Sequence, residues 1–360
     1  TKCLIFRARR GKAYYFHAQG QRLENVQVID YLGFRINDKL SWLDHINKMN
    51  ITLNQRFGAI LKLHASSSTK AVTPALAVYR AQGQSAAIYG ADLWGHTSVP
   101  LLSKTENSFV RSLLKVPQST PIIPLYWDLN LRQIMILAAY RPLKYWIRLW
   151  ITPELEVYRS CLRELLSISP ISPWLSYIKK SFAQLNLPHF WFNPESILSS
   201  AQLILKEAYW NSHFLSYHTS KKPGPLTVRF LNFKPMPSFE LFMDRIEPAL
   251  AKSLYIKFRL STLPLSTFCK NWQPGNSSLG FCPFCPLVEE TYIHFLFFCP
   301  LYTSYHCRWI KPICLNLGFR NCGMALTILT TDSSEHIVFA VSKFIYSAWL
   351  KRLKYLSFIV

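Results

Sequence analysis

The chain has 360 residues, half of them hydrophobic, and its 41 Lys and Arg outnumber its 19 Asp and Glu, which gives a net charge of +22. This apolar content excludes a globally disordered chain, because there is enough side-chain area to bury against the entropy cost of folding. The positive charge favours a polyanionic partner, with nucleic acid ahead of an anionic membrane surface.

Residues 1–40 have the pattern of β structure. Lys2–Phe6 predicts a short apolar strand, and Val26–Ile36 predicts a second strand with a glycine break at Gly33. A basic cluster follows the first strand: Arg7, Arg9, Arg10 and Lys12. These cations could bind phosphate groups. An equally good interpretation is that they lie on the solvated face of a hairpin.

Helical periodicity replaces this pattern from residue 41 onward. Apolar residues recur at helical spacing in 41–60, 69–90, 102–115 and 129–150, where Pro142 predicts a kink. Residues 151–238 contain nine prolines and predict a connector with short helices, such as 195–210. Further helices are predicted at 238–259 and 334–358. We expect the tryptophans at 94, 127, 146 and 150 to belong to the core rather than to stack on bases, and the last helix to pack in the core rather than anchor to a membrane.

These patterns predict a mainly α fold with a short N-terminal β hairpin or edge. We expect four segments: a β segment at 1–40, a helical region at 41–150, the proline-rich connector at 151–238, and a small zinc-stabilised helical domain at 239–360.

The composition also suggests a cellular compartment. No uninterrupted apolar stretch reaches the roughly 18 residues of a spanning helix, and no signal peptide is visible. Nine cysteines are an odd number in a chain too long to need disulfide bonds. We therefore expect an intracellular protein, in the nucleus or the cytoplasm, without a membrane partner. The chain starts with Thr1 and enters a strand at once, so we expect a piece of a longer protein.

The clearest chemical motif is a zinc-ligand pattern formed by Cys282, Cys285, His294 and Cys299. Two thiolates in a Cys-x2-Cys turn can grip one ion, and four Cys and His ligands close a structural site with no position for a reacting water. We expect residues 289–298 to be helical, which places Cys299 some 140° around an ideal helix from His294, at about 100° per residue. The following Pro300 disfavours helical geometry at Cys299 and lets it turn back to the metal.

Two alternatives to this ligand set remain open. In the first, no metal is bound and the cysteines are inert buried thiols. In the second, His306 or Cys307, which are close in sequence, replaces the last ligand.

Catalytic motifs are absent from the sequence. There is no phosphate-binding loop, no dinucleotide-binding glycine pattern, no Gly-x-Ser-x-Gly, and no adjacent pair of aspartates. We expect this chain to be inactive as an enzyme by itself.

Two helices carry further candidate nucleic-acid contacts. Arg111 and Lys115 lie on the predicted helix at 102–115, and Lys252, Lys257 and Arg259 lie on the one at 238–259. Such cations can track a phosphate backbone, although exposed helix faces are normally charged, so a solvated face is the stronger alternative.

Several short segments in order along the chain resemble LINE-type (non-LTR) retrotransposon reverse transcriptases. They are Tyr31-Leu32-Gly33-Phe34-Arg35-Ile36, Leu40-Ser41-Trp42, His45-Ile46, Tyr89-Gly90-Ala91-Asp92-Leu93-Trp94-Gly95, Phe109 to Pro117 with Ser119-Thr120-Pro121, and the Cys-Cys-His-Cys motif with Glu290-Thr291, Phe297 and Pro300-Leu301-Tyr302. The resemblance covers both ends of the chain and leaves 151–238 unmatched.

The resemblance implies RNA-templated DNA synthesis primed at a nicked genomic target. It assigns residues 1–40 to the end of the palm and the primer grip, and 41–150 to the thumb. It places the catalytic aspartates, with their Mg²⁺, before the first strand and therefore outside this chain. The implied contacts are residues 2–6 and Tyr31 to Gly33 near the primer, Arg111 and Lys115 against the template duplex, and the zinc site for RNA or target DNA.

Two other functions remain open. One is a self-standing zinc-dependent RNA- or DNA-binding protein, and the other is an unselected retroelement remnant that folds poorly.

Overall fold

The computed structural model is mainly α-helical, with short strands near the N-terminus, which confirms the predicted fold class. It describes residues 2–6, 15–97, 100–167, 171–196, 199–219, 230–232, 234, 236–265, 280–285, 287–319, 321–331 and 334–357. The predicted phosphate contacts Arg7, Arg9, Arg10 and Lys12 lie outside these residues.

The chain divides into two compact units. Unit 1 comprises Thr1–Ile60, Ala77–Asn107 and Arg132–Ser220, and unit 2 comprises Leu61–Leu76, Ser108–Leu131 and Lys221–Val360. The four consecutive segments expected from the sequence remain a prediction.

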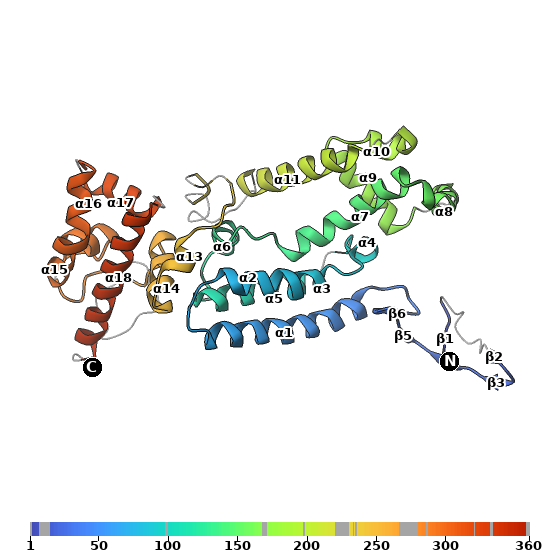
Figure 1. Ribbon diagram of the computed structural model, residues 1–360, viewed down its shortest axis with the longest axis horizontal. Helices are drawn as coiled ribbons and strands as arrows, with labels where there is room; N and C mark the ends of the chain where they lie inside the picture. The colour runs from blue at the N-terminus through green and yellow to red at the C-terminus, as the bar shows by residue number, and fades with distance from the viewer. Residues whose placement is uncertain are drawn as a thin grey trace. The chain divides into compact units, whose positions relative to one another are not determined.

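The strands of unit 1 form three two-stranded pairs (Figure 1). They are β1 (Lys2–Leu4), β2 (His17–Ala18), β3 (Gln21–Arg22), β4 (Glu24–Val26), β5 (Val28–Tyr31) and β6 (Phe34–Asn37). β1 pairs with β4 in parallel, while β2–β3 and β5–β6 are antiparallel. The glycine break expected near the middle of 26–36 is the β5–β6 turn, where Leu32 and Gly33 both have positive φ, +47° and +85°. Two consecutive residues with positive φ are typical of a tight hairpin turn, because the backbone twist of such a turn matches the twist of the two strands it joins.

Helical segments follow the strands from residue 43 to residue 151. Its helices are α1 (Leu43–Ser66), α2 (Thr73–Val78), the π-helical η1 (Tyr79–Gln84), α3 (Ser85–Ala87), α4 (Ala91–Trp94), α5 (Pro100–Leu114), α6 (Ile122–Asp128) and α7 (Ile134–Ile151). The helix predicted at 69–90 is thus made of three consecutive helical segments that begin at Thr73. Pro142 lies inside α7 and does not end it.

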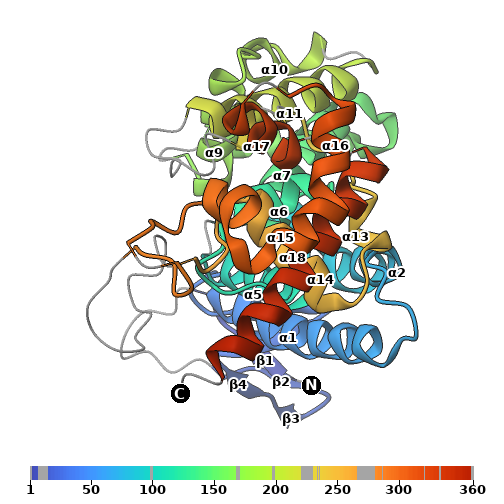
Figure 2. The same ribbon diagram turned by 90° about the vertical axis from the view of Figure 1, so that its left-hand side faces the viewer.

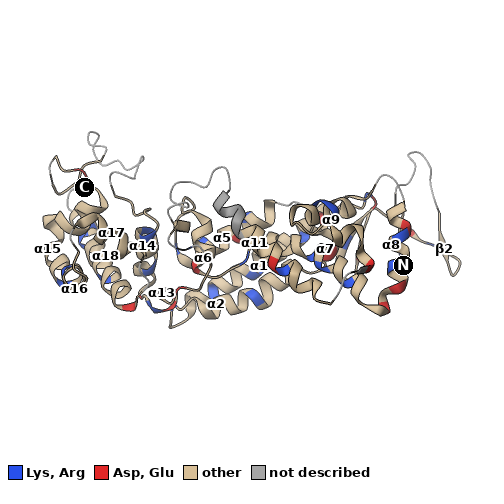
Figure 3. Cartoon of the chain, turned by 90° about the horizontal axis from the view of Figure 1, so that it is seen from above, with Lys and Arg blue, Asp and Glu red and all other residues tan. Residues whose placement is uncertain are grey.

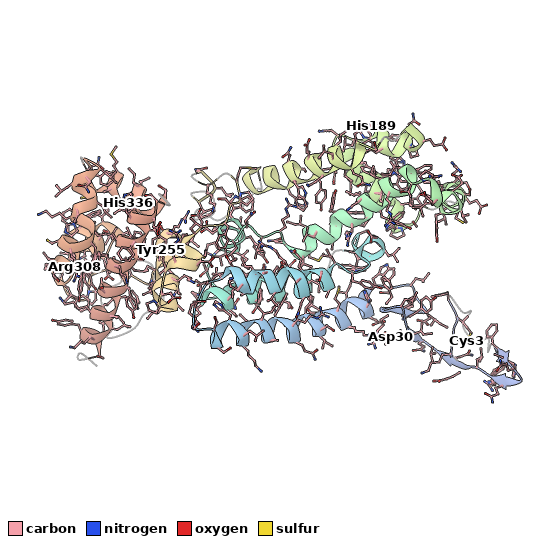
Figure 4. All side chains as sticks on the ribbon, in the orientation of Figure 1. Cys3, Asp30, His189, Tyr255, Arg308 and His336 are labelled. Atoms are coloured by element: carbon pink, nitrogen blue, oxygen red, sulfur yellow. The ribbon has the colours of Figure 1, made fainter. Side chains whose placement is uncertain are left out.

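An ion pair and a glycine contact join the hairpin to the helices of unit 1. Asp30, labelled in Figure 4, pairs with Arg35 at 3.1 Å and with Lys48 of α1 at 2.9 Å. Gly90 has φ +62°, and a Cβ there would lie 2.1 Å from Cζ of Phe34. Only glycine therefore allows the backbone at this position to approach the Phe34 ring so closely.

The proline-rich part of unit 1 is a helical layer around α7. It contains η2 (Pro153–Leu155), α8 (Glu156–Ser167), α9 (Pro173–Gln184), α10 (His189–Phe192), η3 (Pro194–Ser196) and α11 (Ala201–Thr219). Trp146 stacks on Trp191 with centroids 5.0 Å apart, and its indole N–H donates to the Phe190 carbonyl at 2.8 Å. The expectation that the tryptophans belong to the core is confirmed, since Trp94, Trp127 and Trp146 are buried and Trp150 is half-buried.

A carboxylate is completely buried in unit 1. Glu106 accepts a hydrogen bond from the Tyr79 hydroxyl through Oε1 and one from the backbone N–H of Ile134 through Oε2, the latter at 2.9 Å. Ile134 is the first residue of α7, so the carboxylate faces the positive end of that helix's dipole.

Besides α6, unit 2 contains further helices among the residues that the structure describes. They are α13 (Phe242–Arg245), α14 (Ala249–Arg259), η4 (His294–Phe298), η5 (Pro300–Tyr302), α15 (Thr303–Tyr305), η6 (His306–Ile310), α16 (Lys311–Asn316), α17 (Cys322–Thr331) and α18 (Glu335–Leu356). The prediction of one helix over 238–259 is wrong, because the chain leaves helical geometry at Ile246 and resumes it after Pro248. A residue that precedes proline is disfavoured in the α conformation, so Pro248 separates the two helices.

Helix α14 packs along α18 in unit 2 (Figures 1 and 2). Tyr255, labelled in Figure 4, is fully buried in α14 with its ring 5.0 Å from that of Phe242. Helix α18 buries Val341, Phe344 and Ile345, as expected for a core helix. Within the described residues, no helix combines the length and the apolar character needed to cross a membrane.

Four charged side chains form a buried cluster in unit 2. Lys234 Nζ donates to Asp128 at 2.9 Å and also to Glu240, and Arg259 lies 3.7 Å from Asp128 and 3.4 Å from Glu240. All four side chains are less than one tenth exposed. This cluster fastens the end of α6 and the residues before α13 to the end of α14.

Candidate metal centre

Cys282, Cys285, His294 and Cys299 meet in unit 2, all of them buried, with their ligand atoms within 4.8 Å of one another. The Sγ atom of Cys299 lies 3.9 Å from that of Cys282 and 3.8 Å from that of Cys285. A tetrahedral zinc ion with Zn–S bonds of about 2.3 Å separates its sulfur ligands by about 3.8 Å. The group is therefore able to hold a metal ion such as zinc.

A tight turn positions the first two ligands. The backbone N–H of Cys285 donates to the Cys282 carbonyl at 3.3 Å, and that of Val288 donates to the Cys285 carbonyl at 3.2 Å. The N–H of Cys282 in turn donates to the Val288 carbonyl at 2.8 Å. Leu287 occupies a left-handed position with φ +65°. The segment thus folds back on itself and directs both thiols to one side.

A π-helical turn positions the other two ligands. The N–H of His294 donates to Thr291 Oγ1 at 3.1 Å at the start of the turn, and the N–H of Cys299 donates to the His294 carbonyl at 2.8 Å at its end. The expectation of a helix from Glu289 is wrong, since Glu289 and Glu290 precede the helical residues. The expected angle of 140° is wrong for the same segment, because five residues complete roughly one turn of a π-helix. Cys299 is extended (φ −69°, ψ 116°), as predicted from Pro300.

The imidazole of His294 has a free ring nitrogen. Its Nε2 is buried and has no hydrogen-bond partner among the described residues. A buried polar atom without a partner is costly, and a neutral imidazole nitrogen is a normal zinc ligand. The orphaned atom therefore fits a bound cation.

The three thiols have unequal affinities for protons. The hydrogen bond between the two thiols lowers the pKa of Cys282 to about 5, while the same bond and burial raise the pKa of Cys299. Burial raises the pKa of Cys285. A divalent cation that binds here would displace the protons of the thiols, because zinc takes thiolates as ligands. Three thiolates and one imidazole leave no ligand position for a reacting water, so the site suits a structural ion.

The two substitute ligands considered from the sequence lie outside this group. Among the residues that the structure describes, the cluster contains neither His306 nor Cys307. The His306 ring instead packs 5.9 Å from that of Phe297, and Cys307 is exposed.

The predicted nucleic-acid contacts are found in varied environments. Tyr31 is 60% exposed next to the hairpin turn at Gly33, and Lys115 is exposed at the end of α5. The Arg111 guanidinium donates to the Thr120 carbonyl at 3.0 and 3.1 Å and so holds the loop after α5.

The assumption of an exposed basic face on α14 is wrong for two residues. Lys252 and Arg259 are 3% and 4% exposed, and Lys252 Nζ donates to the Lys70 carbonyl. Lys257 is half-buried. Lys252 and Arg259 therefore serve packing within unit 2, and their burial argues against direct phosphate contact.

An ion pair beside the metal ligands escaped the sequence analysis. Arg352 of α18 forms a two-pronged pair with Glu290, with Nη2 3.0 Å from Oε2, and both side chains are almost fully buried. A sequence signal existed, because Arg352 continues the helical spacing of Val341, Ile345 and Ala348 and is the single cation of that stripe.

Comparison of the chain with protein-family models, with curated proteins and with solved structures finds no match.

Proposed function

We propose that the chain is the nucleic-acid-binding C-terminal portion of a non-LTR retrotransposon reverse transcriptase, with zinc as the structural ion of its last domain. The observation that carries this proposal is the geometry of the Cys282, Cys285, His294 and Cys299 group, whose spacing fits tetrahedral zinc. The ligands belong to one of the segments on which the family resemblance rests.

The packing of unit 1 supports the same assignment. Two other segments of the resemblance, 31–36 and 89–95, contact each other through Phe34 and Tyr89, whose ring centroids are 5.3 Å apart. The Tyr89 hydroxyl also donates to the Leu32 carbonyl at 2.9 Å. Segments that are far apart in the chain thus form one local structure, as parts of a single functional site would.

The charge of the chain supports a polyanionic partner. Lys and Arg recur on helices of both units (Figure 3), and the net charge is +22. Positive side chains that neutralise phosphates release condensed counterions, which favours binding at low salt. In the proposed role the chain holds RNA template and target DNA, and the polymerase chemistry with its Mg²⁺ belongs to other residues of the parent enzyme.

Salt-dependent binding tests the proposal. The affinity of the zinc-loaded chain for labelled RNA, single-stranded DNA and duplex DNA of equal length is measured by fluorescence anisotropy over a range of salt. We expect the logarithm of the affinity to fall linearly with the logarithm of the salt concentration. Affinity that does not change with salt, or no binding to any of the three, would contradict the proposal.

Two lysines of unit 2 provide a matched pair for the same titration. Lys115→Gln removes an exposed charge and should reduce the salt slope by about one. Lys252→Met removes a buried charge and should leave the slope unchanged. An unchanged slope in both variants would remove Lys115 from the binding surface.

A further inference from the structure

The last turns of α18 touch the segments that carry the metal ligands. Arg352 pairs with Glu290, which lies between Cys285 and His294 in the chain. The two side chains are 2% and 1% exposed, so the pair is shielded from water. Charge-assisted pairs of this two-pronged kind fix orientation as well as distance.

The same turns contact the residues on either side of this pair. The Arg352 guanidinium lies 5.8 Å from the ring centroid of Phe284, which stands between Cys282 and Cys285. The Tyr355 ring packs edge-on against Phe284 with centroids 6.2 Å apart. Aromatic contacts of this geometry contribute beyond the area they bury.

The segment after the last ligand is held as well. Lys351 Nζ donates to the Leu301 carbonyl at 2.8 Å, two residues beyond Cys299. The backbone N–H of Glu290 also donates to the Gly280 carbonyl at 2.7 Å, beside the bridge between Phe281 and Glu289. The α18 residues thus contact the chain between the ligands and after the last one, and Glu290, which Arg352 holds, is hydrogen-bonded to Gly280 before the first ligand.

The charges explain why an arginine is needed at position 352. Three thiolates around one divalent cation carry a net charge of −1, and Glu290 adds a second negative charge to the same buried region. A buried carboxylate without a counter-charge is strongly destabilising. The guanidinium neutralises Glu290 and so allows an anionic metal centre to form next to it.

We propose that α18 is part of the metal centre, with Arg352 as a positioning residue that orients the ligand loops through Glu290. The inference rests on the proposed function only in requiring zinc at the site, and it does not depend on nucleic-acid binding.

Metal release from the full chain tests this role. The zinc-loaded protein is mixed with excess chromophoric chelator, and the rate of zinc transfer is followed. Arg352→Met should release zinc about 10- to 100-fold faster, the range typical of lost outer-shell partners. Lys354→Met, which removes an exposed charge from the same helix turn, should match the wild type.

A charge-neutral double variant separates positioning from charge compensation. Glu290→Gln/Arg352→Met removes the uncompensated buried carboxylate but also lacks the pair that orients the ligand loops, so it should still release zinc faster than the wild type. A double variant that releases zinc as slowly as the wild type, or an Arg352→Met variant as slow as Lys354→Met, would overturn the proposal. Should Arg352→Met fail to fold, Lys351→Met replaces it; faster release supports the proposal, and an unchanged rate overturns it.

The absorption spectrum of the Co²⁺-substituted protein reports the geometry of the metal site and does not depend on the overall stability of the fold. At full Co²⁺ occupancy and equal helical content, Arg352→Met should shift or weaken the d–d absorption bands of the tetrahedral site. Unchanged bands would assign Arg352 to packing alone, and a wild-type chain that takes up no metal would overturn the inference together with the zinc assignment. A chain that retains zinc but does not bind nucleic acid would contradict the proposed function and would leave the role of α18 standing.

Discussion

Sγ of Cys282 lies 3.9 Å from Sγ of Cys299, although 17 positions of the chain separate the two residues. Closing a loop of this length costs conformational entropy, which a bound ion can repay because the site does not exist in the unfolded chain. The folding of this part of unit 2 is therefore expected to depend on metal.

Removal of one ligand should abolish zinc retention. We expect Cys299→Ser to be purified with little zinc and to melt at a lower temperature than the wild type, as the wild type does after treatment with a chelator. Elemental analysis and thermal unfolding measure both effects. Cys307→Ser changes an exposed cysteine outside the cluster and should retain zinc, so equal zinc content in the two variants would contradict the ligand assignment.

The buried charge cluster should make unit 2 sensitive to the loss of one member. Arg259→Met leaves Asp128 and Glu240 with Lys234 as their one remaining cation in the cluster, which should cost about 3–5 kcal/mol of unfolding free energy. Urea denaturation measures this cost. Lys257→Met alters a half-buried cation on the same helix and should cost much less; similar losses for both variants would argue against the cluster.

Lys252 should weaken the fold at neutral pH. Burial lowers its pKa from 10.5 to about 8, so between these values the unfolded chain binds more protons than the native one and stability rises with pH. Below pH 8 Lys252 is charged in both the native and the unfolded chain, so the full free-energy cost of burying its charge is present. We expect Lys252→Met to be more stable than the wild type by about 1–3 kcal/mol at pH 7 and to lose this advantage toward pH 10.5. An advantage that stays constant over that range would refute the assignment.

Gly90→Ala should destabilise unit 1. The added methyl group would collide with the Phe34 ring and would also stand at φ +62°, so we expect a loss of about 1–3 kcal/mol. Gly58→Ala is the control, because its Cβ meets nothing within 4 Å in the middle of α1, where alanine favours the helix. Equal denaturation midpoints for the two variants would show that the Gly90 contact is unimportant.

The long helices could be predicted from apolar spacing alone. The predicted helix at 334–358 is Glu335–Leu356 in the structure, and the one predicted at 102–115 is Pro100–Leu114. In both, a single apolar stripe faces the core, which is the property that local periodicity reports. The meeting of Cys282, Cys285, His294 and Cys299 was predictable for a similar reason, since the chemistry and spacing of the four residues lie within 18 consecutive positions.

The buried charges could not be predicted in this way. Asp128 and Arg259 are far apart in sequence, and each looks like an ordinary surface residue until the fold brings them together. The same holds for Glu290 and Arg352. The π-helical turn from His294 to Phe298 also escaped prediction, because it depends on the position that Cys299 takes in the folded site.

X-ray absorption at the zinc K-edge tests the central claim most directly. The protein purified without chelator should contain one zinc per chain, with three sulfur ligands at about 2.3 Å and one nitrogen ligand at about 2.0–2.1 Å. Absence of zinc, or a shell made of oxygen and nitrogen alone, would contradict the account.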